Sequence, residues 1–289
     1  MRSGPITETW KWWSRPPKRD ERMLNTKVSF CRIENKYVIK SDVVPFFEEE
    51  LKKHMEVDPY ALNDGHYQVN TIYFDDASDN VVARSISHPD YKEKLRLRSY
   101  GGTHPIFFIE FKNKFGDQVY KVRIILSEEE YENIVFHNVM PSKNGEYAHD
   151  RFIDLLDDFS NRHGGITPKS LIQYERSALI NKPDDQYLRV TIDSNLIYRR
   201  DDFTINKLGG KPLVPSSSRI LEVKIERALP LWLAHLLNQY GIYRDRFSKY
   251  GASFIETREQ SEPSLSLEAS FSSLAESHGM GSYQNSTRK

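Results

Sequence analysis

Apolar and polar residues alternate with a period of two along much of the chain, a pattern typical of β-strands whose two faces meet different surroundings. The alternation covers eight segments, at residues 32–38, 69–74, 92–100, 106–114, 119–126, 170–178, 188–193 and 220–226. No strand–helix–strand rhythm repeats between them. The pattern therefore predicts an α+β fold, an antiparallel eight-stranded β-barrel with helices packed outside, rather than a doubly wound sheet.

Helical signals appear in four segments between these strands. In one of them, Ser127 and Glu130 form a capping-box pattern ahead of an apolar face. The other three are predicted from Ser41 or Asp42 to about His54, around Phe152 to Phe159 with an end at Gly164, and from Leu229 to Tyr240 with an end at Gly241.

The two ends of the chain differ from the middle in composition. Residues 1–25 mix Trp10, Trp12 and Trp13 with basic residues and prolines, which predicts a flexible leader. From Glu259 to the end the chain is Ser-rich and poor in large apolar groups, which predicts a disordered tail over residues 259–289. We therefore expect one domain over residues 26–258, with the tails as candidate contacts to a membrane protein or another protein partner.

The overall charge is balanced, because 41 Lys and Arg residues face 41 Asp and Glu residues. The whole chain thus has no net attraction for nucleic acid, and an anion site must come from local clustering. Cys31 is the one cysteine, which excludes an intramolecular disulfide and favours a cytoplasmic location. No stretch approaches the roughly 20 apolar residues that cross a bilayer, so we expect no transmembrane segment.

Basic residues occupy the polar phase of many predicted strands. Residues two apart project from the same face of a strand, so the basic residues of one segment lie together. The groups that share a face are Lys92, Lys94, Arg96 and Arg98; Glu110, Lys112 and Lys114; Lys121 and Arg123; Arg32, Glu34 and Lys36; Tyr174 and Arg176; and Glu222, Lys224 and Glu226, with Arg189 at the head of one more strand.

Each basic stripe taken alone is better explained as the solvent-exposed face of a sheet. The sign of the charges favours another interpretation, because an exposed sheet usually mixes signs to keep like charges from lying opposite one another. A barrel that holds a ligand can have a polar interior while helices cover its apolar outer face. The stripes therefore predict a basic lumen that binds a polyanion.

Two carboxylates interrupt the basic groups at matching places, Glu110 two residues before Lys112 and Glu222 two before Lys224. Mg²⁺ and Mn²⁺ are commonly bound by one or two carboxylates together with phosphate oxygens and water. The alternative is an internal salt bridge to a neighbouring lysine, an interpretation that suits Glu110 and applies equally to Glu34. Glu222 is the preferred candidate for a metal ligand.

Nine short motifs in this order resemble the VTC domain, the catalytic module of vacuolar transporter chaperone complexes and of stand-alone bacterial polyphosphate polymerases, within the triphosphate tunnel or CYTH-like group. The resemblance spans about residues 27–257. Its carriers are Arg32-Ile-Glu-Asn-Lys-Tyr37, Thr71-Ile-Tyr-Phe-Asp75, Lys94-Leu-Arg-Leu-Arg-Ser-Tyr-Gly101, Phe108-Ile-Glu-Phe-Lys112, Tyr120-Lys-Val-Arg123, Tyr174-Glu-Arg-Ser-Ala178, Leu188-Arg-Val-Thr-Ile-Asp193, Leu221-Glu-Val-Lys224 and Phe247-Ser-Lys249.

The resemblance implies roles for individual residues. Phosphate binding is implied for Lys36, Arg96, Arg98, Lys112, Lys121, Arg176, Arg189, Lys224, Ser248 and Lys249, with Glu222 holding Mn²⁺ or Mg²⁺. Tyr174 is implied as an auxiliary contact, and we expect Arg123 and Arg246 to bind substrate as well. Two positions depart from the family pattern: Arg32 replaces the first glutamate of the hydrolytic relatives, and Arg246 stands where the polymerases tend to have lysine.

The implied activity is transfer of the γ-phosphate of ATP to a growing inorganic polyphosphate chain. A row of cations with one metal suits this chemistry, because phosphoryl transfer needs charge neutralisation and in-line placement more than covalent help. Three alternatives stay open: a triphosphate hydrolase in the same tunnel, a non-catalytic polyphosphate-binding adaptor, and a nucleic-acid-binding barrel. The balanced charge argues against the last of these.

Overall fold

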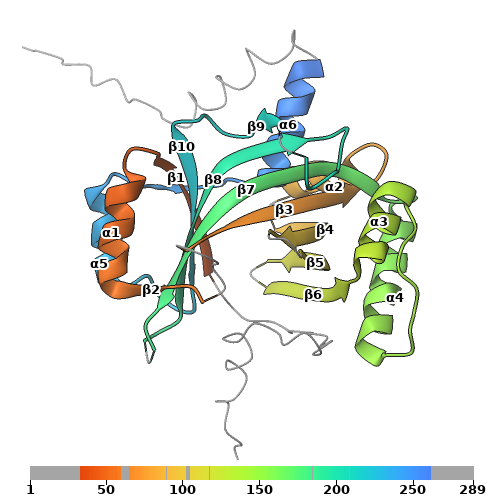
Figure 1. The fold of residues 1–289 in the computed structure, drawn as a ribbon, viewed down its shortest axis with the longest axis horizontal. Helices are drawn as coiled ribbons and strands as arrows, with labels where there is room; N and C mark the ends of the chain where they lie inside the picture. The colour runs from red at the N-terminus through yellow and green to blue at the C-terminus, as the bar shows by residue number, and fades with distance from the viewer. Residues whose placement is uncertain are drawn as a thin grey trace, which may run out of the picture.

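The computed structural model describes residues 33–261, apart from 60–64, 89, 102–104, 117, 184 and 208. One antiparallel sheet forms its centre, in the order β11-β1-β10-β8-β7-β3-β4-β5-β6, with β2 added to β7 and β9 to β8 (Figure 1). Eight strands are long: β1 (Ile33–Lys40), β3 (His66–Asp75), β4 (Tyr91–Tyr100), β5 (Ile106–Phe115), β6 (Gln118–Leu126), β7 (Thr167–Asn181), β8 (Leu188–Arg199) and β10 (Ser218–Ile225). Three are short: β2 (Met55–Val57), β9 (Lys211–Pro212) and β11 (Arg244–Asp245).

The eight long strands correspond to the eight segments with period-two alternation, and the antiparallel α+β architecture is confirmed. The expected closed barrel of eight strands needs correction. The sheet has 11 strands, and within the described residues it is not closed, because β11 and β6 stand at opposite ends of the hydrogen-bonded order. Strands of two or three residues are too short to show alternation, and closure depends on contacts between distant strands.

The sheet curls strongly, as the arch of β7 and β3 in Figure 1 shows. Lys112 of β5 lies 3.3 Å from Glu34 of β1, although β10, β8, β7, β3 and β4 separate these strands in the sheet. We call the face that carries Lys112 and Glu34 the inner face. Contact between side chains so far apart in the strand order requires the inner face to be concave.

Helices cover the outer face in two places (Figure 1). Helices α1 (Val44–His54) and α5 (Leu231–Gln239) lie over β1, β10 and β8, where Phe47 and Leu237 pack with Val223. Helices α3 (Glu128–His137) and α4 (Tyr147–Arg162) lie over β4, β5 and β6, where Phe152 packs with Ile109. Each such side chain, once fully buried, contributes about 1.5–3 kcal/mol, so the apolar phase of the strands is fixed outward.

The predicted helix ends are confirmed in three cases and wrong in one. The capping box of Ser127 and Glu130 begins α3, and Gly164 and Gly241 follow α4 and α5 with φ of 67° and 63°, a conformation that glycine adopts without strain. Neither Ser41 nor Asp42 caps α1, whose N-cap is Val43 without a side-chain hydrogen bond. A proline in the first turn of α1 lacks the N–H that a cap would bind.

Two helices have no counterpart among the predicted ones: α2 (Asn80–Ser87) and α6 (Lys249–Ser261). The buried carboxylate of Asp75 organises both. It accepts hydrogen bonds from the backbone N–H of Val81 and Val82 at the start of α2, each at 2.9 Å, and from the hydroxyl of Tyr250 in α6 at 2.9 Å. This carboxylate replaces a local capping signal, so only the tertiary contact reveals it.

Helix α6 continues to Ser261, so residues 259–261, the first three residues of the expected tail, are helical. The remaining division into leader, domain and tail stays a prediction, because residues 1–32 and 262–289 lie outside the described residues. Within the described part of the chain, no helix combines the length and the apolar character that crossing a membrane requires.

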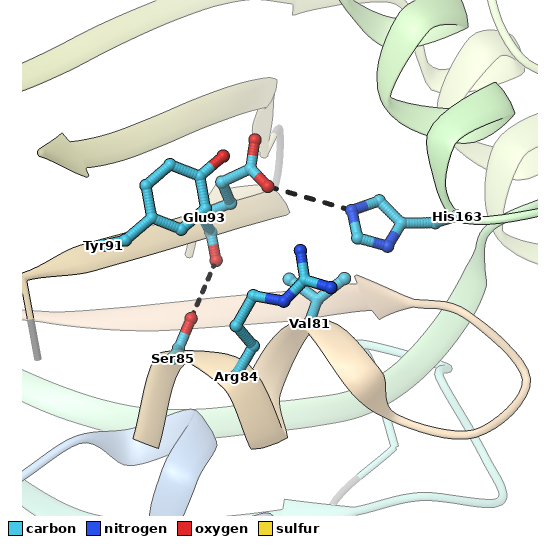
Figure 2. A pocket seen from close by; sticks show the side chains of 6 residues that line it. All are labelled: Val81, Arg84, Ser85, Tyr91, Glu93 and His163. Atoms are coloured by element: carbon cyan, nitrogen blue, oxygen red, sulfur yellow. Dashed lines mark hydrogen bonds and ion pairs between the residues drawn. The ribbon is translucent and has the colours of Figure 1, made fainter. Parts of the chain in front are cut away.

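The outer face of β4 carries one polar cluster, which anchors α2 and α4 (Figure 2). Arg162 of α4 donates to both carboxylate oxygens of Glu93, at 3.0 and 3.3 Å, and His163 lies 3.8 Å from the same carboxylate. Ser85 of α2 donates to the backbone oxygen of Glu93 at 3.3 Å. The cavity between these groups has no room for a water molecule, so the cluster joins elements rather than binds a ligand.

A bulge in β8 changes which of its residues face inward. The pairing with β7 shifts between Gln173 and Glu175, and Asn195 adopts the left-handed conformation with φ of 53° while donating to Glu175 at 3.0 Å. Asparagine tolerates this conformation better than most residues. Asp193 and Tyr198 are five residues apart, so strict alternation would place them on opposite faces. Because of the bulge, both lie on the inner face.

Candidate functional site

The strand register places the predicted basic residues on the inner face. Lys36 lies opposite Glu222, Arg189 opposite Lys224, and Arg96 opposite Glu110. Every second residue along each of these strands lies on the same face as these pairs. The predicted site residues that this register brings to the inner face are Lys36, Glu222, Lys224, Arg189, Arg176, Tyr174, Arg96, Arg98, Lys112, Lys121 and Arg123.

The start of α6 adds groups from outside the sheet. Lys249 is buried, with its Nζ 2.5 Å from Asp193 of β8, and Ser248 accepts a hydrogen bond from Lys94 of β4 at 3.1 Å. Tyr250 stacks on Tyr73 of β3 with the rings 4.6 Å apart. Because β4 and β8 lie on opposite sides of β7 and β3, this segment bridges the concave face.

The centre of the site is a buried ion cluster around Asp193 and Glu222. Arg176 donates to both oxygens of Asp193, at 2.6 and 2.8 Å. The nitrogens of Lys249, Arg176, Lys36 and Lys224 lie 3.4, 3.5, 3.6 and 3.9 Å from the Glu222 carboxylate. Burial alone would raise the pKa of Glu222, but Lys249 and Lys36 outweigh it, so the pKa is lowered and the carboxylate is charged.

A second cluster forms around Glu110, whose side chain is buried. Lys121 Nζ lies 2.6 Å from this carboxylate, Arg98 lies 3.7 Å away, and Arg96 donates to it through Nε. Burial would raise the pKa of Glu110, and Arg96 with Lys121 lowers it below the usual range. Glu110 thus pairs with three cations and offsets one of their charges, which agrees with the salt-bridge interpretation of this residue.

Two ionisable groups on the inner face change charge near neutral pH. Burial lowers the pKa of Lys224 to about 7, against the attraction of Glu34 and Glu222. Burial would raise the pKa of Tyr100, but Arg98 lowers it to about 7, and its hydroxyl lies 3.4 Å from Arg98. The charge of the site therefore depends on pH in the physiological range.

Three predicted substrate contacts differ in placement. Arg123 packs over the ring of Phe108 at 4.5 Å. The ring of Tyr174 is covered by Lys249 at 4.7 Å and by Arg176 at 5.3 Å, so it holds both cations in place. Arg246 is exposed. Its positive charge acts on the site at a distance, because it is one of the charges that lower the pKa of Lys92.

A metal ion fits Glu222 only together with phosphate. Within the described residues no group of three His, Cys, Asp or Glu side chains is placed to hold a metal. The four nearby cations would also repel a free divalent ion. Mg²⁺ and Mn²⁺ bind readily through one carboxylate when phosphate oxygens and water complete the shell, so the donor set fits a metal–phosphate complex.

Sequence reasoning missed Asp193 as a site residue. It belongs to the same alternation as Arg189 and is completely buried, with 0% of its surface exposed. Its position four residues after Arg189 on a predicted strand could have placed it on the same face. Lys94 belongs to a predicted basic stripe but received no role of its own, and Tyr100 was outside the expected site, although both share the alternation of Arg96 and Arg98.

The sequence profile of the VTC domain family matches residues 31–256. This chain belongs to the VTC domain family. None of the curated proteins compared with the chain matches its sequence significantly.

Solved structures resemble this VTC domain at low sequence identity. A Bacillus halodurans protein provisionally assigned as an adenylate cyclase shares 14% identity with a TM-score of 0.49, covering 75% of this chain and 93% of that one. The PH1819 protein of Pyrococcus horikoshii shares 14% with a TM-score of 0.39, covering 78% and 99%. A match within the Schizosaccharomyces pombe Mediator head module has 12% identity, a TM-score of 0.34 and coverage of 81% and 95%.

Proposed function

We propose that this VTC domain is a metal-dependent polyphosphate polymerase that transfers the γ-phosphate of ATP to the end of an inorganic polyphosphate chain. The observation that carries the proposal is the convergence of cations from β1, β4, β5, β6, β7, β8, β10 and α6 on one concave face. So many cations on a curved inner surface match a linear polyanion better than a compact ligand.

The residues divide the work of phosphoryl transfer between placement and charge. Arg96, Arg98 and Arg176 carry planar guanidinium groups that suit bidentate contacts to phosphate, and Lys249 adds a charge between β8 and β10. When bound, a divalent metal at Glu222 would neutralise phosphate charge and orient the transferred group. These fixed charges lower the barrier by stabilising the charge that develops on the phosphoryl oxygens.

The reaction needs no strong general base. The terminal oxygen of a polyphosphate chain is already anionic at neutral pH, and it forms a bond to the γ-phosphorus of ATP. The bond between that phosphorus and the β,γ-bridging oxygen breaks, and ADP leaves with the electron pair. The products are ADP and a polyphosphate chain that is longer by one phosphate.

Hydrolysis is the second candidate function, and Tyr100 favours it. With a pKa of about 7, the Tyr100 side chain beside Arg98 is partly phenolate at neutral pH, and the phenolate is able to accept a proton from an attacking water. Water would then replace the chain end, and the products would be ADP and phosphate. A polyphosphate-binding adaptor would give neither product.

Product analysis distinguishes these functions. Purified protein is incubated with ATP, Mn²⁺ and a short polyphosphate primer, with a parallel sample in EDTA, and the chains are separated on a gel stained for polyphosphate. We expect chains longer than the primer and one ADP for each phosphate added, and no elongation in EDTA. Release of phosphate without longer chains would establish hydrolysis, and unchanged ATP would contradict both enzymatic functions.

The affinity for polyphosphate is expected to fall as pH rises above about 7. In this range the ligand-free protein loses the proton of Lys224, and the Tyr100 phenol becomes negative. Both changes make the site less positive, so phosphate binding must be accompanied by the uptake of protons. The expected loss is up to about tenfold per pH unit for one group. Tripolyphosphate titrations at several pH values, in buffers of different ionisation enthalpy, measure the affinity and the protons taken up.

Lys224→Arg is the matched variant for this pH dependence, because arginine keeps its charge throughout the range. The variant is expected to take up fewer protons and to lose less affinity than the unmodified protein. The titration of tripolyphosphate itself is common to both proteins and cancels. Equal pH dependence in the two proteins would contradict the role given to Lys224, and Tyr100→Phe identifies the share of the phenol.

A further inference from the structure

Five lysines on the inner face lie in a like-charge arrangement that sheets ordinarily avoid. Lys92 of β4 lies directly opposite Lys114 of β5, and Lys94 lies opposite Lys112, which in turn lies opposite Lys121 of β6. Like charges directly opposite on neighbouring strands destabilise a sheet. The arrangement therefore has a cost in the free protein that a bound anion would remove.

Carboxylates do not neutralise three members of this arrangement. Among the described residues, no carboxylate oxygen lies within ion-pair distance of Lys92, Lys94 or Lys114, and the one polar contact of Lys94 is the hydroxyl of Ser248 at 3.1 Å. Burial, together with Lys36 and Lys112, lowers the pKa of Lys94, and burial with Lys114 lowers that of Lys92. We call Lys92, Lys94 and Lys114 the lysine group.

The arginines of the inner face are placed differently. Arg96 and Arg98 share the Glu110 carboxylate, and Arg176 is held by Asp193. We call these three residues the arginine group. Paired arginines present planar donors in fixed positions, which suits a phosphoryl group that must be oriented. Unpaired lysines present compact charges on flexible stems, which suit a chain that must move.

We infer that the lysine group is a separate subsite for the acceptor polyphosphate chain, while the arginine group holds the triphosphate donor. The inference rests on the proposed function and adds a division of the inner face. An elongating chain advances by one phosphate after each transfer, so its subsite must bind successive units without a fixed register. Ser248 completes the subsite, because its hydroxyl becomes available to phosphate when Lys94 turns to the ligand.

The test compares two triple variants. Lys92→Gln, Lys94→Gln and Lys114→Gln together remove the lysine group, and Lys52→Gln, Lys182→Gln and Lys211→Gln remove three exposed lysines elsewhere. We expect the first variant to raise the KM of the primer chain at least about tenfold and the KM of ATP less than about twofold. The control variant should leave both constants unchanged, although its net charge is the same.

Binding without turnover gives an independent measurement. A labelled long polyphosphate chain is titrated in EDTA, and the Kd is expected to rise with the primer KM in the lysine-group variant. Removal of the like-charge pairs should leave thermal stability equal or higher, and Lys94→Gln alone provides a milder variant. Equal loss of ATP and primer affinity, or unchanged primer affinity, would overturn the subsite. Failure of the unmodified protein to elongate any chain would instead overturn the proposed function.

Discussion

Glu222→Gln is expected to reduce metal-dependent chain elongation by about 100-fold or more. The amide keeps the shape of the carboxylate but lacks the charge that binds a divalent metal. Glu222 faces Lys36, Arg176, Lys224 and Lys249 within 3.9 Å, so a phosphate chain that draws these cations away would free it for the metal. The measurement is the initial rate of elongation at saturating ATP over a series of Mn²⁺ concentrations.

Glu110→Gln is the matched control, because Glu110 is also buried on the inner face among cations. It should lower stability yet leave the Mn²⁺ concentration at half-saturation unchanged. Electron paramagnetic resonance measures Mn²⁺ binding directly: we expect binding to the unmodified protein only with tripolyphosphate present, and none to Glu222→Gln. Equal Mn²⁺ binding by both variants would remove Glu222 from the metal site.

Asp193→Asn is expected to lower the free energy of unfolding by about 3–5 kcal/mol, because two buried cations, Arg176 and Lys249, lose their closest charged partner. Asp193 accepts from Arg176 at 2.6 and 2.8 Å and from Lys249 at 2.5 Å, in a position with no exposed surface. Urea unfolding followed by circular dichroism measures the loss.

Tripolyphosphate should restore part of this stability, because phosphate oxygens replace the missing charge and the ligand binds only the folded protein. The control is Asp202→Asn, which removes a more exposed pair with Lys207 at 2.6 Å and should lower stability much less, because solvent screens exposed ion pairs. A ligand that stabilised Asp193→Asn less than the unmodified protein would show that phosphate does not occupy the position of this cluster.

The strands and their polar phase were predictable because period-two alternation is a local property. The segment from Lys92 to Tyr100 shows the general case: Leu95 and Leu97 must be buried under helices, and Arg96 and Arg98 then have to project from the other face. The capping box at Ser127 was predictable for the same reason, since both of its partners lie within four residues.

Elements that depend on distant partners were not predictable. Helix α2 begins where Asp75 accepts its backbone N–H groups, and α6 is held by Tyr250 on the same carboxylate. The bulge at Asn195 also left no clear signal, although it determines which residues of β8 face inward. The three short strands are likewise products of the surrounding sheet.

The sequence by itself determined which side chains share a face, because a strand fixes the direction of alternate residues through its own backbone. It could not determine that the basic faces of seven strands line one concave surface, nor which cations form ion pairs with carboxylates. Those outcomes depend on the curvature of the sheet, which brings Lys112 within 3.3 Å of Glu34 and leaves Lys94 with only a hydroxyl. Curvature arises from packing between distant elements, so the tertiary structure alone decides how the charges are shared.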